Sequence, residues 1–411
     1  MVSHAELIYD WNVQGIHFSM EREVTFDDET LRDGLQSPSI TDPPIEKKIE
    51  LLHIMDSIGI ETADVGLPGA GPRAVADVTA LVEEIGKSKL KITPNRAART
   101  VFPDIDPIYE ITQKTGVPIL AATFLGCSQI RQYTESWDLN RLLKLTADAV
   151  TYAVNKGLEV MFVTEDTTRA HPQVIAKLYT EAIRCGAKRI TIADTVGHAT
   201  PVGAYNLVSF LKHIIDGLGA KDVKIDWHGH RDRALSIANS IAAYIAGADQ
   251  LHGTALGVGE RCGNTPMELL LVNLHLMKGL EGKRLDLLPK YVQLVSESYE
   301  VPIPSNYPVF GSDAFETATG VHAAAVIKAF RKNDLWLANR VYSGVPADLF
   351  GMEQKIRIGP MSGKSNIIFW LEKQGIEPKE ELVEKIFDKA KQSNRLLTDE
   401  EILSIINTPA S

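Results

Sequence analysis

The chain has 411 residues, of which 44% are hydrophobic and 23% charged, an ordinary composition for a protein with one large core and a smaller unit. Its formal net charge of −10, from 43 basic and 53 acidic residues, disfavours nucleic-acid phosphates as partners. The sequence has no apolar run of membrane-spanning length, no secretory signal pattern at its start, and three scattered cysteines that make neither a disulfide framework nor a C-x-x-C site. We therefore expect a cytoplasmic protein.

Short β-type runs recur along the chain, and each is followed by a longer stretch with helical periodicity. The eight runs are 23–30, 61–66, 90–95, 117–124, 159–166, 189–195, 223–230 and 250–259. The helical stretches between them include 46–59, 140–157, 171–186, 201–219 and 233–248, and many end in glycine, as helix C-termini do. Eight such units over roughly 270 residues predict a (β/α)8 TIM barrel. A doubly wound sheet is the alternative, but even spacing favours closure.

The pattern changes after Lys283. Four prolines fall within twenty residues of the next segment, which is typical of a linker. Helical stretches at 317–332, 362–374, 379–392 and 398–406 then predict a small, mostly helical C-terminal region. We therefore expect an N-terminal extension over 1–22, the catalytic barrel over 23–283, a linker over 284–316 and a helical subdomain over 317–411.

Two histidines, His228 and His230, lie one residue apart at the end of the seventh predicted strand. Because side chains alternate along a strand, both imidazoles and Asp232 would point to one face, with the two rings rooted about 7 Å apart. An isolated H-x-H is more often a polar strand end, so a metal site requires a third ligand. Asp33, at the end of the first strand, supplies a carboxylate, and this mixed set suits Zn, Mn or Fe.

Other polar residues also fall at strand ends, where the reacting groups of a barrel of this kind lie. They are Arg32 and Asp33 after the first strand, Glu165 and Asp166 after the fifth, Asp194 and Thr195 after the sixth, and Glu260 and Arg261 after the eighth. Each alone could be a helix cap or a structural ion pair. Arg32 could hold a carboxylate or neutralise a developing negative charge. For Asp166 two kinds of role are open. It could have a structural role, by orienting Arg32 or capping the next helix, or it could act directly in the chemistry.

Together these motifs resemble the metal-dependent barrel family of 2-isopropylmalate, homocitrate and citramalate synthases. The family's opening motif, D-x-T-L-R-D-G-x-Q, stands at 28–36, and its E-D, D-T-V-G, H-x-H and G-x-G-E-R-x-G-N motifs stand at 165–166, 194–197, 228–230 and 257–264. Beyond the barrel, 319–328 and 361–367 look like two further family segments. The resemblance runs in consistent order from about Val24 to Ile376, and the motifs are specific only in combination.

The resemblance implies a divalent metal (Zn, Mn or Mg) held by Asp33, His228 and His230, with Asn264 close or ligating. The co-substrate would be acetyl-CoA, and activation by a monovalent cation is left open. The metal would chelate a 2-oxo acid, whose other contacts are implied to be Arg32 for the developing charge, Thr195 for the carboxylate and Glu165 for proton transfer.

His322 and Tyr342 match the family's candidates for removing the methyl proton of acetyl-CoA. They lie beyond the predicted linker, so the resemblance implies a homodimer in which the partner subunit supplies them. The alternative is a buried histidine and a core tyrosine of the helical region. Besides this partner subunit and the small-molecule substrates, neither nucleic acid nor a membrane is expected as a partner.

Met161 and Val163 bear on the choice of 2-oxo acid. Homocitrate synthases carry an arginine and a serine there to match a distal carboxylate, which these apolar side chains would leave unpaired. We therefore expect 2-oxoisovalerate and the product 2-isopropylmalate, with citramalate or another alkylmalate as the alternative. Less expected are a metal-dependent C–C lyase and a non-catalytic barrel.

Many leucine-pathway members of the family carry an additional C-terminal regulatory domain. This chain ends at Ser411, which leaves no room for one after the predicted helical subdomain. We therefore expect a short form whose activity is unchanged by leucine at millimolar concentration.

Overall fold

The computed structural model describes residues 4–13 and 21–407 and divides into two compact units. The first comprises residues 1–283 and 297–301, and the second comprises residues 284–296 and 302–411. The segment expected to be a linker contains secondary structure, the 3-10 turn η6 (Leu285–Leu287) and helix α11 (Leu288–Ser298).

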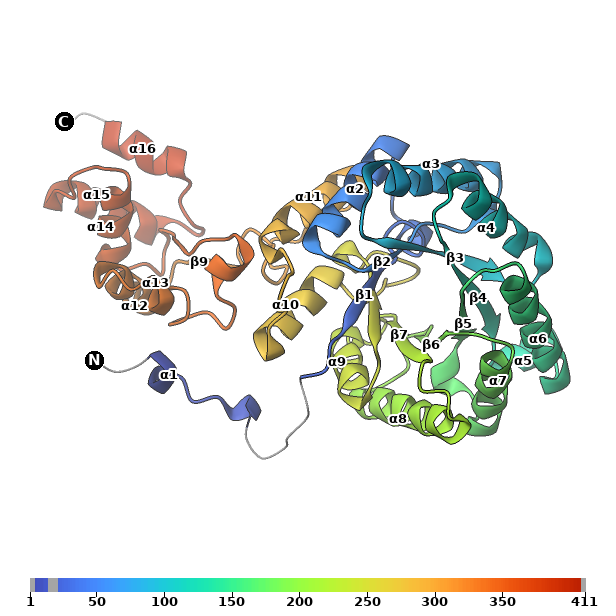
Figure 1. Cartoon of the computed structure of the whole chain (residues 1–411). Coiled ribbons are helices and arrows are strands. Elements are labelled where there is room, and N and C mark those ends of the chain that lie inside the picture. Colours follow the sequence, from blue (N-terminus) through green and yellow to red (C-terminus); the bar gives the residue numbers. More distant parts are fainter. Residues whose placement is uncertain (1–3, 14–20, 408–411) are drawn as a thin grey trace. The chain divides into compact units, whose positions relative to one another are not determined.

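The first unit is a closed barrel of eight parallel strands, which pair in chain order until β8 meets β1 (Figure 1). The strands are β1 (Thr25–Asp28), β2 (Thr62–Asp64), β3 (Thr93–Arg99), β4 (Leu120–Gly126), β5 (Val160–Glu165), β6 (Arg189–Asp194), β7 (Lys224–Gly229) and β8 (Gln250–Gly253). The predicted TIM barrel is therefore confirmed. Strand β3 runs four residues beyond the run at 90–95, because Arg99 still pairs with Phe124 of β4 despite the polar character of the sequence.

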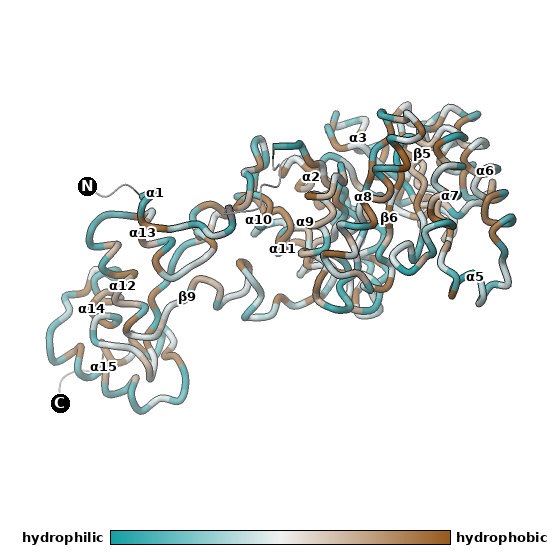
Figure 2. The backbone as a smooth tube through the Cα atoms, turned by 90° about the horizontal axis from the view of Figure 1, so that it is seen from below, coloured by the Kyte–Doolittle hydropathy of each residue, from teal (hydrophilic) through white to brown (hydrophobic). Residues whose placement is uncertain are grey.

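Helices surround the barrel and cover the outer face of its strands (Figure 1). They are α2 (Ile45–Ile58), α3 (Pro72–Ser88), α4 (Phe102–Thr115), α5 (Gln129–Glu135), α6 (Leu139–Asn155), α7 (Pro172–Arg184), α8 (Pro201–Leu218), α9 (Ser236–Ala246) and α10 (Met267–Lys278). Their inward faces are apolar, and hydrophilic residues are common in the loops (Figure 2). Helix α8 shows how the sequence sets the ends: Thr200 caps its first turn and Gly219, at φ 68°, closes its last. Before the barrel lie α1 (His4–Leu7) and the turn η1 (Trp11–Val13).

The second unit is mostly helical, as expected. Its helices are α12 (Gly320–Arg331), α13 (Leu335–Ala338), α14 (Lys364–Lys373), α15 (Glu380–Gln392) and α16 (Asp399–Asn407). A two-stranded parallel sheet of β9 (Glu316–Thr317) and β10 (Lys355–Ile356) was not predicted, because runs this short carry no periodicity. The buried side chains of Ile367, Leu371 and Ile386 lie in its core.

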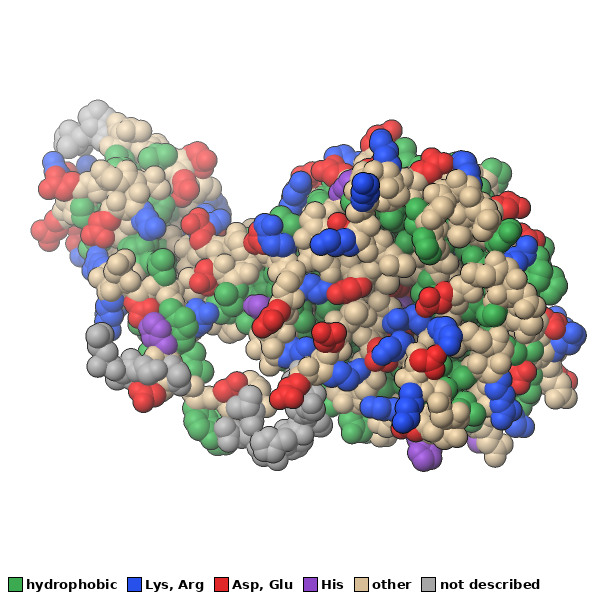
Figure 3. Space-filling model, viewed as in Figure 1, with side chains coloured by type: hydrophobic (Ala, Val, Ile, Leu, Met, Phe, Trp, Pro, Cys, Tyr) green, Lys and Arg blue, Asp and Glu red, His purple; other side chains and the backbone are tan. Residues whose placement is uncertain are grey.

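Acidic and basic side chains are interspersed over the visible face of the barrel, with no large area of one sign (Figure 3). Among the residues that the structure describes, no helix combines the length and apolar character needed to span a membrane.

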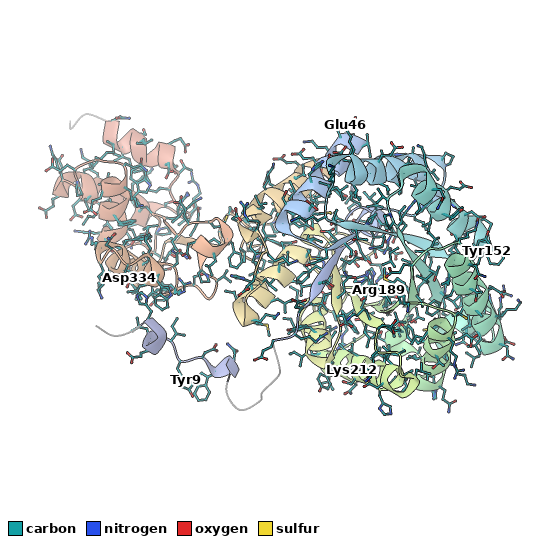
Figure 4. All side chains as sticks on the ribbon, in the orientation of Figure 1. Tyr9, Glu46, Tyr152, Arg189, Lys212 and Asp334 are labelled. Atoms are coloured by element: carbon teal, nitrogen blue, oxygen red, sulfur yellow. The ribbon has the colours of Figure 1, made fainter. Side chains whose placement is uncertain are left out.

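Two arginines of the barrel, the partly buried Arg189 and the buried Arg96, are expected to have opposite effects on stability. Arg189 lies inside the ring of strands (Figure 4) and makes two contacts of 2.6 and 2.9 Å with the fully buried Asp226. Arg96 is also fully buried, but none of its three guanidinium nitrogens has a hydrogen-bond partner among the described residues. Burial accordingly lowers the pKa of Arg96 to about 9.

We expect Arg189→Met to destabilise the barrel by about 3–5 kcal/mol, because it leaves the Asp226 carboxylate buried without its main partner. Arg96→Met removes an unpaired buried charge and is expected to raise the thermal midpoint. Thermal unfolding of the two variants beside the parent measures both effects. A lower midpoint for Arg96→Met would show that its guanidinium has a stabilising partner.

Candidate active site

A pocket opens inside the barrel at the carboxyl ends of its strands. It has a volume of about 210 Å³, and all eight strands or the loops after them contribute to its lining. The predicted site residues that line it are Arg32, Asp33, Met161, Val163, Glu165, Thr195, His228 and His230. The structure therefore brings together eight residues that the sequence distributes over almost 200 positions.

Asp33, His228 and His230 form a buried cluster in this pocket that could hold a metal ion. The Oδ2 atom of Asp33 lies 3.5 Å from Nε2 of His228 and 3.8 Å from Nε2 of His230. Two ligand atoms bound tetrahedrally to one ion at ~2.0–2.1 Å lie roughly 3.3–3.4 Å apart, so these separations are close to those of a ligand set. In addition, Oδ1 of Asp33 and Nδ1 of His230 lack hydrogen-bond partners among the described residues. The donor set therefore fits a divalent ion.

Asn264 lies next to this cluster, because its backbone forms an isolated β-bridge with His230. Its side-chain nitrogen donates to the carbonyl of Val258 at 3.2 Å, which fixes the amide. Its Oδ1 is buried and has no hydrogen-bond partner in the described part of the chain. Asn264 could therefore serve as a fourth ligand, although it does not line the pocket.

The electrostatics of the cluster favour a neutral His230. Burial and the neighbouring His228 lower the pKa of His230 to about 4. At neutral pH its imidazole therefore carries a free lone pair, which is the form that binds metals.

Arg32 brings a positive charge beside the cluster. Its guanidinium contacts three carboxylates: Nε lies 2.6 Å from Asp64, and its two other nitrogens lie 3.3 Å from Glu29 and Asp33. Burial acts to lower the pKa of Arg32, but the carboxylates of Asp64, Glu29 and Asp33 outweigh it and raise that pKa. Arg32 is therefore a permanent cation with a fixed orientation.

On the opposite wall, Glu165 is the last residue of β5 and Thr195 directly follows β6. Burial raises the pKa of Glu165, so its carboxyl holds a proton at a higher pH than an exposed glutamate would. The hydroxyl oxygen of Thr195 accepts the backbone N–H of Asp166 at 2.8 Å and keeps its own proton for a ligand. The Asp166 carboxylate accepts hydrogen bonds from Arg169 and Ser128, and Asp166 does not line the pocket.

His322 and Tyr342 belong to the second unit. Their rings stack with centroids 4.2 Å apart and an interplanar angle of 29°. Both side chains are exposed, Tyr342 by 48%. His322 is the third residue of α12, and the exposed Val321 precedes it. The two residues therefore form a surface pair within their own unit rather than a buried core contact.

Comparison with known proteins assigns the chain to a family. The family model described as HMGL-like matches residues 23–295, which is the whole barrel and the segment after it. The chain belongs to the HMGL-like family. Homocitrate synthase AksA of Methanopyrus kandleri is 31% identical to this HMGL-like chain over 373 residues, 90% of this chain and 87% of the relative. The 2-isopropylmalate synthase of Sediminispirochaeta smaragdinae is 30% identical over 405 residues, 95% of this chain and 76% of the relative. The predicted resemblance to this group of synthases is confirmed.

Solved structures agree on the HMGL-like fold. The HMG-CoA lyase of Bacillus subtilis superposes with a TM-score of 0.57 at 19% identity, over 69% of this chain and 96% of the lyase. The HMG-CoA lyase of Brucella melitensis gives a TM-score of 0.55 at 18% identity, over 67% of this chain and 98% of the lyase. At these identities the likeness concerns the barrel fold alone.

Some pocket residues of this HMGL-like barrel were not predicted from the sequence. Glu29, Asp64, Phe124 and His252 all line the cavity. Asp64 ends β2 and Glu29 follows β1, so the strand-end rule that selected Arg32 and Asp33 could have selected them too. Phe124 and His252 lie within predicted strands and not after them. They could have been identified as pocket residues only by knowing that their side chains point into the barrel.

Proposed function

We propose that this HMGL-like protein is a metal-dependent acyltransferase that condenses acetyl-CoA with a 2-oxo acid. For 2-oxoisovalerate, the acetyl methyl carbon would bond to the 2-oxo carbon, water would cleave the thioester, and the products would be 2-isopropylmalate and free CoA. The observation that carries the proposal is the buried Asp33, His228 and His230 cluster beside Arg32 in the barrel pocket, where Oδ2 of Asp33 faces the Nε2 atoms of both histidines.

Asp33, His228 and His230 would hold the ion, with Asn264 as a further oxygen donor. When bound, a divalent ion (Zn, Mn or Mg) would supply Lewis-acid polarisation of the 2-oxo group. The three carboxylates around Arg32 fix its guanidinium in the pocket, so it can neutralise the negative charge that develops on the substrate oxygen without reorganising. The Thr195 hydroxyl is free to donate to the substrate carboxylate.

Glu165 would hold or move a proton on the face opposite Arg32, because burial keeps its carboxyl protonated to a higher pH than usual. Removal of the acetyl methyl proton requires another base. We assign this step to His322, with Tyr342 stacked on it as the second polar group. Both are exposed on the second unit, as groups delivered to another subunit must be. We therefore propose a homodimer whose partner supplies them.

The pocket wall supports a 2-oxo acid with an apolar tail. Met161, Val163, Phe124, Ala97 and Ala122 line it. Arg32 is the one Lys or Arg side chain among the lining residues that the structure describes, and it is already engaged by three carboxylates. A second carboxylate on the substrate, as in 2-oxoglutarate, would be desolvated without a counter-ion. This favours 2-isopropylmalate over homocitrate as the product, with citramalate as the alternative because pyruvate also fits.

Release of CoA thiol by the metal-loaded protein tests this proposal, with acetyl-CoA and a panel of 2-oxoisovalerate, pyruvate, 2-oxobutanoate and 2-oxoglutarate. We expect the highest kcat/KM for 2-oxoisovalerate and at least about a tenfold lower value for 2-oxoglutarate, since discrimination by an unpaired charge exceeds that by a methyl group. A preference for 2-oxoglutarate would overturn the substrate assignment. No thiol release with any 2-oxo acid would overturn the condensation itself.

The raised pKa of Glu165 predicts the pH dependence. If Glu165 acts as a base, kcat/KM rises as the carboxyl loses its proton. The folded-state pKa lies above the ordinary 4.5, so the midpoint of this acidic limb is expected above pH 4.5. Glu165→Gln should remove the limb and lower kcat by roughly 10²–10⁴-fold. A pH–rate profile of both proteins measures this, and an unchanged limb in Glu165→Gln would assign it to another group.

A further inference from the structure

Glu29 occupies the first variable position of the opening motif, yet it is buried beside a proposed metal ligand. Its side chain follows β1 and is only 4% exposed. Its Oε2 atom lies 2.7 Å from Nδ1 of His228, whose Nε2 atom faces Asp33 at 3.5 Å. The two nitrogens of one imidazole therefore lie between two carboxylates, Glu29 on one side and the ligand Asp33 on the other.

His252 of β8 holds the other oxygen of Glu29. Its Nδ1 atom lies 2.8 Å from Oε1 of Glu29, and its Nε2 atom lies 3.7 Å from Asp226, which Arg189 anchors. Closure of the barrel makes this contact possible, because β1 and β8 are neighbours and Asp28 pairs with Gly253. His252 is 2% exposed, so water does not compete for the contact.

The distances from Glu29 to the two imidazoles indicate whether these groups share a proton or bind a common metal ion. Glu29, His228 and His252 could also be regarded as a ligand set. However, two ligand atoms bound tetrahedrally to one ion at ~2.0–2.1 Å lie roughly 3.3–3.4 Å apart, whereas the contacts of Glu29 with the two imidazoles are 2.7 and 2.8 Å. The contact with His252 is a hydrogen bond. The contact with His228 has the length of a hydrogen bond between N–H and a carboxylate but not its alignment, so Oε2 of Glu29 has no hydrogen-bond partner among the described residues, and a small rotation of the ring or the carboxylate would form the bond.

We propose that Glu29, held in place by His252, is a positioning residue that fixes the Nδ1–H tautomer of His228 and thereby directs its Nε2 lone pair to the metal. The inference rests on the metal site of the proposed function but not on the reaction. Carboxylates that accept the second N–H of a ligating histidine orient the ring, and their loss typically weakens metal binding by about 10–100-fold.

The test is the dissociation constant of Zn²⁺ for the metal-free full-length protein, measured by competition with a chromogenic chelator. We expect Glu29→Ala to weaken binding by about 10–100-fold. Glu29→Gln retains a carbonyl acceptor for the His228 N–H and is expected to lose less, so it tests the idea even where Glu29→Ala folds poorly. Glu84→Ala is the matched control: Glu84 contacts His53 at 2.8 Å on the surface, away from the pocket, and its removal should leave the constant unchanged.

A second readout follows the tautomer itself. In ¹⁵N spectra of the zinc-loaded protein, His228 should show a protonated Nδ1 and a metal-bound Nε2, and Glu29→Ala should lose this pattern. Wild-type affinity in both Glu29 variants, or two zinc ions bound per chain, would overturn the inference while leaving the proposed function standing. A parent protein that binds no zinc, manganese or magnesium would overturn both.

Discussion

Replacing Asp33 with alanine is expected to reduce CoA release by roughly 10³-fold or more. The carboxylate is the one acidic member of the proposed ligand set, and its Oδ2 atom faces both imidazoles. A bound ion contributes several kcal/mol to stabilisation of the developing charge, and each 1.36 kcal/mol corresponds to a tenfold change in rate. Steady-state kinetics with saturating acetyl-CoA and 2-oxo acid, together with the metal content of the purified variant, measure the effect.

Asp222→Ala is the control for this variant, because Asp222 is an exposed carboxylate paired with Lys188 on the surface. It should retain full activity and metal content. Circular dichroism must show that Asp33→Ala keeps the barrel. A folded Asp33→Ala protein with near-parental activity would show that the cluster does not hold the catalytic ion.

Mixed dimers are expected to show the second large effect. Homodimers of Asp33→Ala and of His322→Ala should both be nearly inactive. In a mixed dimer of the two, one barrel keeps Asp33 and receives His322 from its partner, so about half of the parental activity should return, because a symmetric dimer has two equivalent sites. Two affinity tags allow the mixed dimer to be purified before its rate of thiol release is measured.

The complementary mixture makes this experiment decisive. A dimer of a parental chain with an Asp33→Ala, His322→Ala double variant carries the same two changes in a different arrangement. If the partner supplies His322, neither barrel of that dimer is complete and activity should be absent. If each chain supplies its own His322, the complementary dimer keeps one working site and the first mixture has none, which would contradict a shared site.

The sequence was sufficient to predict the barrel and the proximity of Asp33, His228 and His230 for physical reasons. Strand periodicity and helix ends are local properties, and parallel strands bring their carboxyl ends to one face. Asp33 and the two histidines could therefore be placed together without knowing how the strands pair. The apolar residues Met161 and Val163 could be placed in the pocket by the same rule.

The support around the cluster could not be predicted in that way. Glu29 and His252 are 223 positions apart and meet only because β8 pairs with β1 in one specific register. The extension of β3 was missed because Arg96 and Arg99 give it a polar sequence, although Arg96 is fully buried. Buried polar residues inside a barrel depend on register, which a pattern of hydrophobicity does not specify.

Anomalous diffraction from crystals loaded with Mn²⁺ and 2-oxoisovalerate locates the metal and the 2-oxo acid in the barrel. We expect one peak per barrel, about 2.0–2.3 Å from the Asp33 carboxylate and from the Nε2 atom of each of His228 and His230. The 2-oxo acid would lie beside it with its tail toward Met161. A peak elsewhere, or a 2-oxo acid bound in the pocket with no metal at these three residues, would refute the proposed metal site.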